Sequence, residues 1–312
     1  MKTSDYIDIF VPSYHRPHNV KTIRHFRKLG WPGEKLHIFV DSATDDIAEY
    51  QKSAKDEYGC QLHIFDMSEA RRRYDYVHRA SVSRRSAGQA RNMFQDFAEA
   101  NGIDFYMVSD DDSSNYQIRP FGKYFQVVNN AIFLNRIFLE IRDMMRRYHI
   151  GLFGLSQTGD VYSNEYDSRL VRWKVMNTTF YNLPYIYRGE RGVQDDDTSL
   201  FTGVMNEGLF TCSLAYGIVL LQTPSAKAPG GLTDLYNECK LLNKSLVCPI
   251  QFPSAIYAER QVMNGNRLHH RIVKKNLMPC IIKGRANNLA WDTYPEDTPF
   301  TNEPKRNFDL NR

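Results

Sequence analysis

The feature that most constrains the fold is a regular alternation of short apolar segments with helical patterns through the first third of the chain. Each apolar segment has the length of a strand and ends at polar residues. The expected strands are 6–11, 35–40, 60–65 and 103–108, and the expected helices are 19–29, 45–58 and 86–100. Such an alternation predicts the α/β class, with a doubly wound, largely parallel sheet and helices on its faces.

Polar residues follow three of the expected strands, at Ser13–Arg16, at Asp41 and at Asp110–Asp112. The carboxyl ends of parallel strands meet at one edge of an open sheet, and ligands bind in the crevice beyond that edge. We therefore expect these three polar segments to face one crevice.

The rest of the chain is expected to elaborate this core. A long amphipathic pattern over 125–148 predicts a helix that covers the sheet, and the segments 150–155 and 177–187 have extended patterns. An acidic loop at 194–197 precedes a short helix over 198–206. The last residues, 291–312, are rich in Pro, Asn and Asp and are expected to form a loop-like tail or a lid.

Composition excludes several other classes. With 13% aromatic residues in 312, the chain has far more aromatic content than one that cannot fold. The longest apolar stretch, Ser213–Leu221, is less than half of the ~20 residues that a transmembrane helix needs, and no secretory signal is visible. Five scattered cysteines without metal-binding spacing suggest neither disulfides nor zinc. These features predict a soluble protein of the cytoplasm.

Charge is distributed unevenly, although the net charge of +4 is mild. One basic block lies within 69–92, where arginines alternate with Tyr74, Tyr76 and His78, and a second lies within 260–291. Guanidinium groups with interleaved aromatic rings suit phosphates and stacked bases. The alternative for the first block is a solvated loop whose last arginines bind a diphosphate.

Three adjacent aspartates, Asp110–Asp112, follow a strand expected to be buried. Adjacent carboxylates repel one another, and hard oxygen ligands suit Mg²⁺ or Mn²⁺, so a divalent cation is their natural occupant. Such an ion bridges a nucleotide diphosphate and takes up the charge that develops as it leaves. The alternative is an ordinary solvated loop or a helix cap.

Four motifs occur in order along the first third of the chain. They are Ile9-Phe-Val-Pro-Ser-Tyr-His-Arg-Pro17, Val40-Asp-Ser-Ala-Thr-Asp45, Gly88-Gln-Ala-Arg-Asn92 and Ser109-Asp-Asp-Asp-Ser113. Together they resemble the ordered, family 2-like motif set of GT-A glycosyltransferases. The resemblance covers about residues 6–115 and implies a Rossmann-like, mostly parallel sheet with flanking helices and an elaborated C-terminal acceptor part.

The same resemblance implies a domain organisation and a donor site. One glycosyltransferase domain would span 1–290, with a nucleotide-sugar donor half at 1–115 and an acceptor half at 116–290, followed by the tail 291–312. The donor would be a nucleotide-diphosphate sugar, with a UDP-sugar favoured. Including arginines of the first basic block, the expected donor-binding residues are Pro12, Ser13, Tyr14, Arg16, Asp41, Arg84, Arg85, Gly88, Arg91, Asn92, Asp110 and Asp111.

The segment Gln194-Asp-Asp-Asp-Thr-Ser-Leu200 resembles the second acidic motif of these enzymes, where an Asp at a helix start is the general base. Family members usually carry Glu-Asp there, so Gln194 leaves the register open. Asp195 is our first choice, with Asp196 and Asp197 as alternatives, and a base across the sugar from the diphosphate would give inversion. The structural alternative is an acidic helix turn favoured by the helix dipole.

GT-A enzymes often complete the metal shell with a C-terminal histidine. The resemblance therefore implies that Mn²⁺ or Mg²⁺ is held by Asp112, Asp110 and His269, or His270 in place of His269. The alternative is that the histidine pair is ordinary polar surface.

The two basic blocks would flank one crevice, which favours a phosphate-rich acceptor. In this respect the chain resembles bacteriophage GT-A enzymes that glycosylate hydroxymethylated pyrimidines, such as hydroxymethylcytosine, in DNA. The target base would be rotated out of the duplex, activity would be salt-sensitive, and the location would be the host cytoplasm. The glycines of Ala228-Pro-Gly-Gly231 would let the backbone approach the acceptor, unless they only form a turn. The expected acceptor-binding residues are Arg72, Tyr74, Tyr76, Gly230, Gly231, Arg271 and Lys274.

Other functions remain open from the sequence. The acceptor could be a polysaccharide, a lipid-linked glycan or a protein, and the chain could instead bind nucleotide-sugars or nucleic acid without catalysis. A nucleotidyltransferase would also use a metal and paired carboxylates. A dehydrogenase and a Ser or Cys hydrolase are disfavoured because neither GxGxxG after the first strand nor GxSxG occurs. No protein partner and no membrane span are indicated.

Overall fold

The computed structural model describes residues 2–44, 46–74, 87–118, 126–157, 170–171, 175, 177–186, 195–222, 245–261 and 267–277. The strands are β1 (Asp8–Pro12), β2 (Leu36–Asp41), β3 (Gln61–Phe65), β4 (Phe105–Ser109), β5 (Ser113–Ile118), β6 (Gln126–Val127), β7 (Ile150–Gln157), β8 (Leu170–Val171), β9 (Thr178–Asn182), β10 (Phe210–Gln222), β11 (Ile256–Gln261) and β12 (Arg267–Ile272). The helices are α1 (Lys21–Leu29), α2 (Ile47–Ser53), α3 (Met67–Arg73), α4 (Ala87–Ala100), α5 (Ala131–Arg147) and α6 (Asp196–Asn206), and residues 245–251 are also helical.

One large sheet forms the centre of the molecule. Its strand order is β3-β2-β1-β4-β9-β7-β10-β5-β6, and β8 pairs with β10. Strands β3, β2, β1 and β4 are mutually parallel, whereas β9 lies antiparallel between β4 and β7. The predicted α/β class with flanking helices is confirmed, although the sheet is mixed beyond β4.

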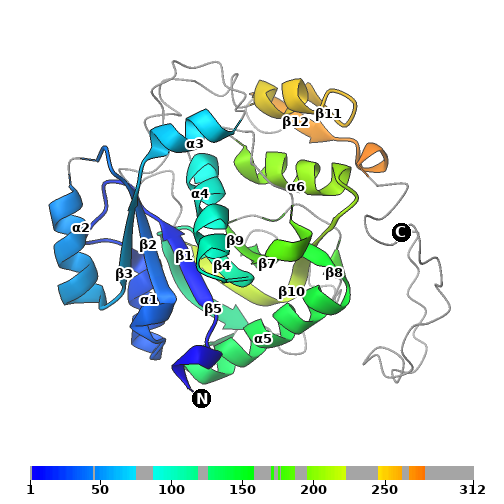
Figure 1. The fold of residues 1–312 in the computed structure, drawn as a ribbon. Coiled ribbons are helices and arrows are strands. Elements are labelled where there is room, and N and C mark those ends of the chain that lie inside the picture. The colour runs from blue at the N-terminus through cyan, green and yellow to red at the C-terminus, as the bar shows by residue number, and fades with distance from the viewer. Residues whose placement is uncertain are drawn as a thin grey trace, which may run out of the picture.

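The two faces of the sheet are covered by different helices (Figure 1). Strand residues alternate between the faces, so Ile9 and Val11 pack in one core cluster and Phe10 in the other. Helices α1 and α5 supply Ile23, Phe26, Leu134 and Phe138 to the first cluster. Helices α4 and α6 supply Ala90, Phe94, Leu200 and Val204 to the second. This packing fixes where the N-terminal turns of α1, α4 and α6 lie relative to the strand ends.

Most expected elements are present with shifted boundaries. The helix expected at 198–206 begins at Asp196, because acidic side chains in a first helical turn are favoured by the helix dipole. The segment expected to be extended at 177–187 contains β9 and then a short 3-10 turn at Leu183–Tyr185. The tail 291–312 lies outside the described residues.

A second, two-stranded sheet is formed by the antiparallel hairpin of β11 and β12. The hairpin and the helix at 245–251 lie against α6 (Figure 1). A separate apolar cluster joins them, made of Phe201, Met205, Cys248, Phe252, Ala255, Ile256 and Leu277. Among the described residues, no helix is both long enough and apolar enough to cross a membrane.

Candidate active site

The three polar strand ends meet at one edge of the sheet, as expected. Strands β2, β1 and β4 are parallel neighbours, so their carboxyl ends bring Asp41, Ser13 and Asp110–Asp112 together. Ser13, Asp41, Asp111 and Asp112 are all buried. The acidic edge is therefore partly screened from water, which strengthens every electrostatic interaction within it.

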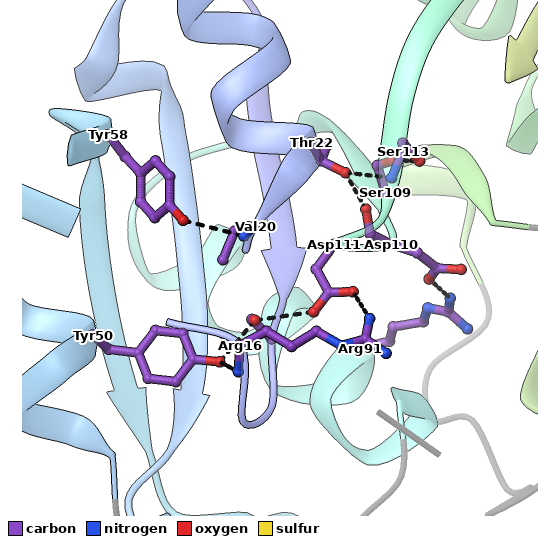
Figure 2. A network of polar contacts seen from close by, with 11 residues as sticks. Arg16, Val20, Thr22, Tyr50, Tyr58, Arg91, Ser109, Asp110, Asp111 and Ser113 are labelled. Atoms are coloured by element: carbon purple, nitrogen blue, oxygen red, sulfur yellow. Dashed lines mark hydrogen bonds and ion pairs between the residues drawn. The ribbon is translucent and has the colours of Figure 1, made fainter. Parts of the chain in front are cut away.

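Asp111 ties the first loop to the acidic loop (Figure 2). Arg16 Nη1 lies 2.6 Å from Asp111 Oδ1, and the Ser13 hydroxyl donates to Asp111 Oδ2 at 3.0 Å. The Tyr50 hydroxyl accepts from the Arg16 amide at 2.9 Å and lies 2.8 Å from Ser13 Oγ. Burial raises the pKa of Asp111 to about 6, with Arg16 opposing this shift. Two of the predicted donor-binding residues, Arg16 and Asp111, therefore pair with each other.

Thr22, in the first turn of α1, holds the backbone of the acidic loop. Its hydroxyl donates to the Asp110 carbonyl oxygen and accepts from the Ser113 amide at 3.0 Å. The Thr22 amide donates to the Asp111 carbonyl oxygen at 3.3 Å. Thr22 is fully buried, so these contacts are shielded from competing water. The loop between β4 and β5 is consequently fixed by a helix that lies about 90 residues earlier in the sequence.

Asp112 differs from its two neighbours. Its Oδ1 atom is buried and has no hydrogen-bond partner among the described residues. Burial raises the pKa of Asp112, with Arg16 and Lys21 opposing the shift, and burial also raises the pKa of Asp110 to about 7. An orphaned carboxylate oxygen in a cluster of acids is the kind of group that a divalent cation satisfies.

The carboxylate set fits a metal that takes part of its shell from a substrate. In the part of the chain that the structure describes, no group of three or more His, Cys, Asp or Glu side chains is arranged to hold a metal ion. Mg²⁺ is commonly bound by one or two carboxylates together with substrate phosphates and water. Asp112 and Asp110 match that pattern.

Arg91 connects the acidic loop with the second acidic motif. It comes from α4, and its Nη2 atom lies 3.3 Å from Asp110 Oδ1, while Nη1 contacts Asp196 Oδ2. The Arg91 and Asp196 side chains are each only 10% exposed. Burial raises the pKa of Asp196, and Arg91 opposes this rise. Arg91 therefore joins two acidic motifs that are far apart in the sequence into one site.

Asp195 is the residue that caps α6, but its carboxylate does not perform the usual capping role. The backbone is left-handed at Asp195, with φ +55°, a conformation that Asp tolerates better than most residues. No side-chain capping hydrogen bond forms, whereas the Asp195 carbonyl accepts the Ser199 amide at 2.9 Å. The Asp197 carboxylate instead accepts the Thr198 amide at 2.9 Å. The three aspartates of this motif thus have three different sets of contacts.

The histidine pair is split between two environments. His270 is buried, and its Nδ1 atom lies 3.0 Å from Asp195 Oδ2. His269 is half-buried and lies opposite Glu259 in the hairpin register, with its ring 4.6 Å from that of His270. The structure therefore brings His270 to the candidate base.

The other donor-binding candidates lie on the same edge or outside the described residues. Pro12 ends β1, and the ring of Tyr14 lies 3.9 Å from that of His15. Asp41 Oδ1 accepts the amides of Ala43 and Met67, both at 3.3 Å. Gly88 and Asn92 are buried in α4, while Arg84 and Arg85 lie outside the described residues.

The acceptor-binding candidates are described only in part. Arg72 is exposed and lies 3.8 Å from Asp66 Oδ2, and the Tyr74 hydroxyl donates to Asp96 Oδ1 at 2.9 Å. Arg271 contacts Glu259 on the hairpin. Lys274 follows the hairpin in a short 3-10 turn, and Tyr76, Gly230 and Gly231 lie outside the described residues.

Sequence reasoning missed Thr22 and Tyr50. Thr22 lies in the first turn of an expected helix, where a hydroxyl close to a catalytic loop could have been suspected. Tyr50 is fully buried, and its ring fits an ordinary core position. No local signal predicts its hydroxyl contacts, because their partners lie 34 and 37 residues away.

The α/β fold, with paired acidic motifs at the carboxyl edge of its sheet, is that of an enzyme of the glycosyltransferase class. More particularly, the model of the TET-associated glycosyltransferase family matches residues 7–231, and the chain belongs to that family. His270 and the hairpin that carries it lie beyond the matched residues.

Solved structures show more distant likeness. A mannosyltransferase from Pyrobaculum calidifontis is 13% identical with a TM-score of 0.43, and the match covers 70% of this chain and 56% of that one. Glucosyl-3-phosphoglycerate synthase from Mycobacterium tuberculosis is 11% identical with a TM-score of 0.43, and the match covers 86% of this chain and 87% of that one. TarS 1–349 from S. aureus is 12% identical with a TM-score of 0.39, and the match covers 80% of this chain and 72% of that one. A search of curated protein sequences gives no match.

Proposed function

We propose that the protein transfers a sugar from a nucleotide-diphosphate sugar, with a UDP-sugar favoured, to the hydroxyl of a 5-hydroxymethylated pyrimidine in DNA. The observation that carries this proposal is the Arg91 bridge, which contacts Asp110 in the acidic loop and Asp196 beside the candidate base. Donor and acceptor chemistry would thus take place in one buried site.

The cation, Mn²⁺ or Mg²⁺, would be held by Asp112 and Asp110. The orphaned Asp112 Oδ1 supports this assignment, as do the Mn²⁺ complexes of the mannosyltransferase and the phosphoglycerate enzyme named above. When bound, the cation would neutralise the charge that develops on the leaving diphosphate. Of the two histidines, His269 stays the candidate for this metal shell, because His270 lies against Asp195.

Asp195 would act as the general base. Of the three aspartates in the motif, Asp196 is engaged by Arg91 and Asp197 by the amide of Thr198. Asp195 would accept the proton of the acceptor hydroxyl, while Arg91 and the acidic loop fix the donor on the other side of the reacting carbon. Attack from the side opposite the diphosphate would invert the configuration at that carbon.

Modified DNA is the acceptor that we favour. The association with TET in the family description hints at modified DNA, and the basic residues of 69–92 and 260–291 suit a phosphate backbone. The duplex base would have to leave the stack to reach a buried carboxylate. A polysaccharide, lipid-linked glycan or protein acceptor is the alternative.

Donor binding is tested by calorimetry with UDP, GDP, CDP, ADP, ATP and NAD, in Mn²⁺ or Mg²⁺ and again with EDTA. We expect one nucleoside diphosphate to bind in a metal-dependent way. Asp112→Asn should weaken this binding at least ~10-fold, because substitutions of metal-binding residues, and of the residues that orient them, commonly lower metal affinity by that factor. Asp143→Asn, on the exposed side of α5, is the matched control and should bind like the wild type. Failure of every diphosphate to bind in either metal would overturn the glycosyl-donor proposal.

Transfer is tested with hydroxymethylcytosine DNA and with the same duplex carrying cytosine. Sugar should be incorporated only into the hydroxymethylated duplex, and Asp195→Asn should lower the rate by about 10²- to 10⁴-fold, the usual contribution of a general base. Donor binding by this variant should remain within about twofold of wild type, since Asp195 lies on the acceptor side. Transfer to glycan, lipid or protein acceptors alone would overturn the DNA assignment, and binding without any turnover would indicate a non-catalytic protein.

A further inference from the structure

The C-terminal hairpin is fastened to the helix that carries the candidate base. Phe201 and Met205 of α6 pack in one apolar cluster with Phe252 and Ile256. Ser199 Oγ donates to Gln251 Oε1 at 2.8 Å, which adds a polar contact between α6 and the helix at 245–251. The position of β12 relative to α6 is consequently set by both packing and hydrogen bonding.

This docking places the ring of His270 between two residues of the α6 N-terminus. His270 Nδ1 lies 3.0 Å from Asp195 Oδ2, and Nε2 lies 3.5 Å from Thr198 Oγ1. The His270 and Asp195 side chains are 7% and 3% exposed, and Thr198 is fully buried. The Nδ1 contact is at ion-pair distance but does not have the geometry of a hydrogen bond, whereas Nε2 can accept from the Thr198 hydroxyl. His270 therefore contacts both the residue that precedes α6 and a residue in its first turn.

The backbone around Asp195 makes the orientation of its carboxylate dependent on His270. An Asp before a helix usually turns its carboxylate onto the amides of the first helical turn. Asp195 makes no such bond, and the amide of Thr198 is taken by Asp197. The Asp195 carbonyl is also engaged, by the Ser199 amide and by the thiol of Cys248, at 2.9 and 3.6 Å. The peptide is fixed, and the Asp195 carboxylate lies against His270 and not on the amides of α6.

We propose that His270 is a positioning residue that orients the Asp195 carboxylate toward the acceptor hydroxyl, so that the C-terminal hairpin completes the active site. The inference rests on the proposed role of Asp195 as the base. Without His270, the carboxylate would turn onto the amides of α6, and proton transfer from the acceptor would become slower. Donor and metal binding would be unaffected, because they involve the acidic loop after β4.

The experiment compares two substitutions at His270 in the full-length protein. His270→Phe keeps the ring and removes both nitrogens, whereas His270→Asn places an amide donor near the position of Nδ1. We expect His270→Phe to lower kcat for transfer by about 10- to 100-fold, the effect usual for a residue that orients a reacting group, and His270→Asn to restore kcat to within about fivefold of wild type. The donor KM and the half-saturating Mn²⁺ concentration should change less than about twofold.

A double-variant measurement separates positioning from a general structural effect. In the Asp195→Asn background, His270→Phe should lower the residual rate by less than about twofold, because the group that it orients has already been changed. Thr198→Val removes the second contact to the ring and should lower kcat in the same direction, while Thr198→Ser should not. Tyr257→Ser, an exposed substitution on the same hairpin, is the control for hairpin stability and should leave kcat unchanged.

Three results would overturn the inference. The first is an unchanged kcat in folded His270→Phe. The second is a large rise in half-saturating Mn²⁺, which would make His270 a metal ligand, and the third is an equal loss in the wild-type and Asp195→Asn backgrounds. The wild-type transfer assay tests the proposed function separately. If the wild type transfers sugar to an acceptor other than DNA, the His270 variants are measured with that acceptor. If the folded wild type transfers sugar to no acceptor, both proposals are overturned.

Discussion

At the scale of single residues, three adjacent aspartates with the same intrinsic chemistry have three different environments. Asp111 is neutralised by Arg16, Asp110 contacts Arg91, and Asp112 keeps a buried oxygen without a hydrogen-bond partner among the described residues. Because an unpaired buried carboxylate is costly, Asp112 has the most to gain from a cation. The local contacts, and not the residue type, distinguish a structural carboxylate from a candidate metal ligand.

Thr22 is the residue on which the shape of this acidic loop depends. Thr22→Val removes the hydroxyl that bonds the Asp110 carbonyl oxygen and the Ser113 amide, and leaves both backbone groups buried. We expect the free energy of unfolding to fall by about 2 kcal/mol and the half-saturating metal concentration to rise, because buried backbone groups lose their partners. Thr22→Ser keeps the hydroxyl and serves as the control. Denaturant unfolding and metal titration measure both effects, and a Val variant equal to the Ser variant would contradict the prediction.

At the scale of elements, the site depends on where helices begin. The first turns of α1 and α6 supply Thr22 and Asp196, and the second turn of α4 supplies Arg91. The two core clusters fix these helices on the faces of the sheet. The antiparallel strand β9, between β4 and β7, lies next to the strand that ends in the acidic loop. The alternation of strands and helices thus brings these polar side chains together at one edge of the sheet.

His63, on the outer strand β3, makes the stability of the fold depend on pH. Burial, with His37 adding to it, lowers the pKa of His63 from 6.5 to about 4. Between these values the unfolded chain binds a proton that the folded chain does not, so this contribution to stability is present above pH 6.5 and is lost as the pH falls toward 4. His63→Phe keeps a ring beside Phe39 and Phe97 and should flatten the decline in melting temperature between pH 7 and pH 5.

His18 provides the opposite control for this measurement. Hydrogen bonds that the His18 ring donates to the Glu57 and Glu49 carboxylates raise its pKa above its ordinary value. Its contribution to stability is therefore present below pH 6.5 and is lost as the pH rises. His18→Gln should therefore make the decline at low pH steeper. A His63→Phe variant with the wild-type pH profile would show that burial does not keep this histidine neutral.

At the scale of the whole molecule, charge distribution matters more than net charge. The chain carries only +4, but the segments 69–92 and 260–291 are strongly basic, and the second contains β12 of the hairpin that docks on α6. If four phosphates are contacted, DNA affinity should fall on the order of 100-fold between 50 and 200 mM salt. The KM for hydroxymethylcytosine DNA, measured across this range, checks the prediction. A hydroxymethylcytosine nucleoside is the control because it has no phosphate backbone, and equal salt dependence of the two acceptors would contradict it.

The sequence by itself determined the α/β class, the parallel strands β1 to β4 and the acidic residues at their carboxyl ends. These features depend on apolar periodicity and on residues that are close neighbours in the chain. The motif order also indicated a glycosyltransferase, which the family match confirms.

The tertiary structure alone decided how the polar groups pair. Arg91 and Asp196 are 105 residues apart, Arg16 and Asp111 are 95 apart, and His270 reaches α6 from a hairpin beyond the main sheet. No local pattern encodes such pairs, because they arise when helices and strands pack and bury their charges together. The reason is physical: a buried charge is stable only beside its partner, and packing determines which partner is within reach.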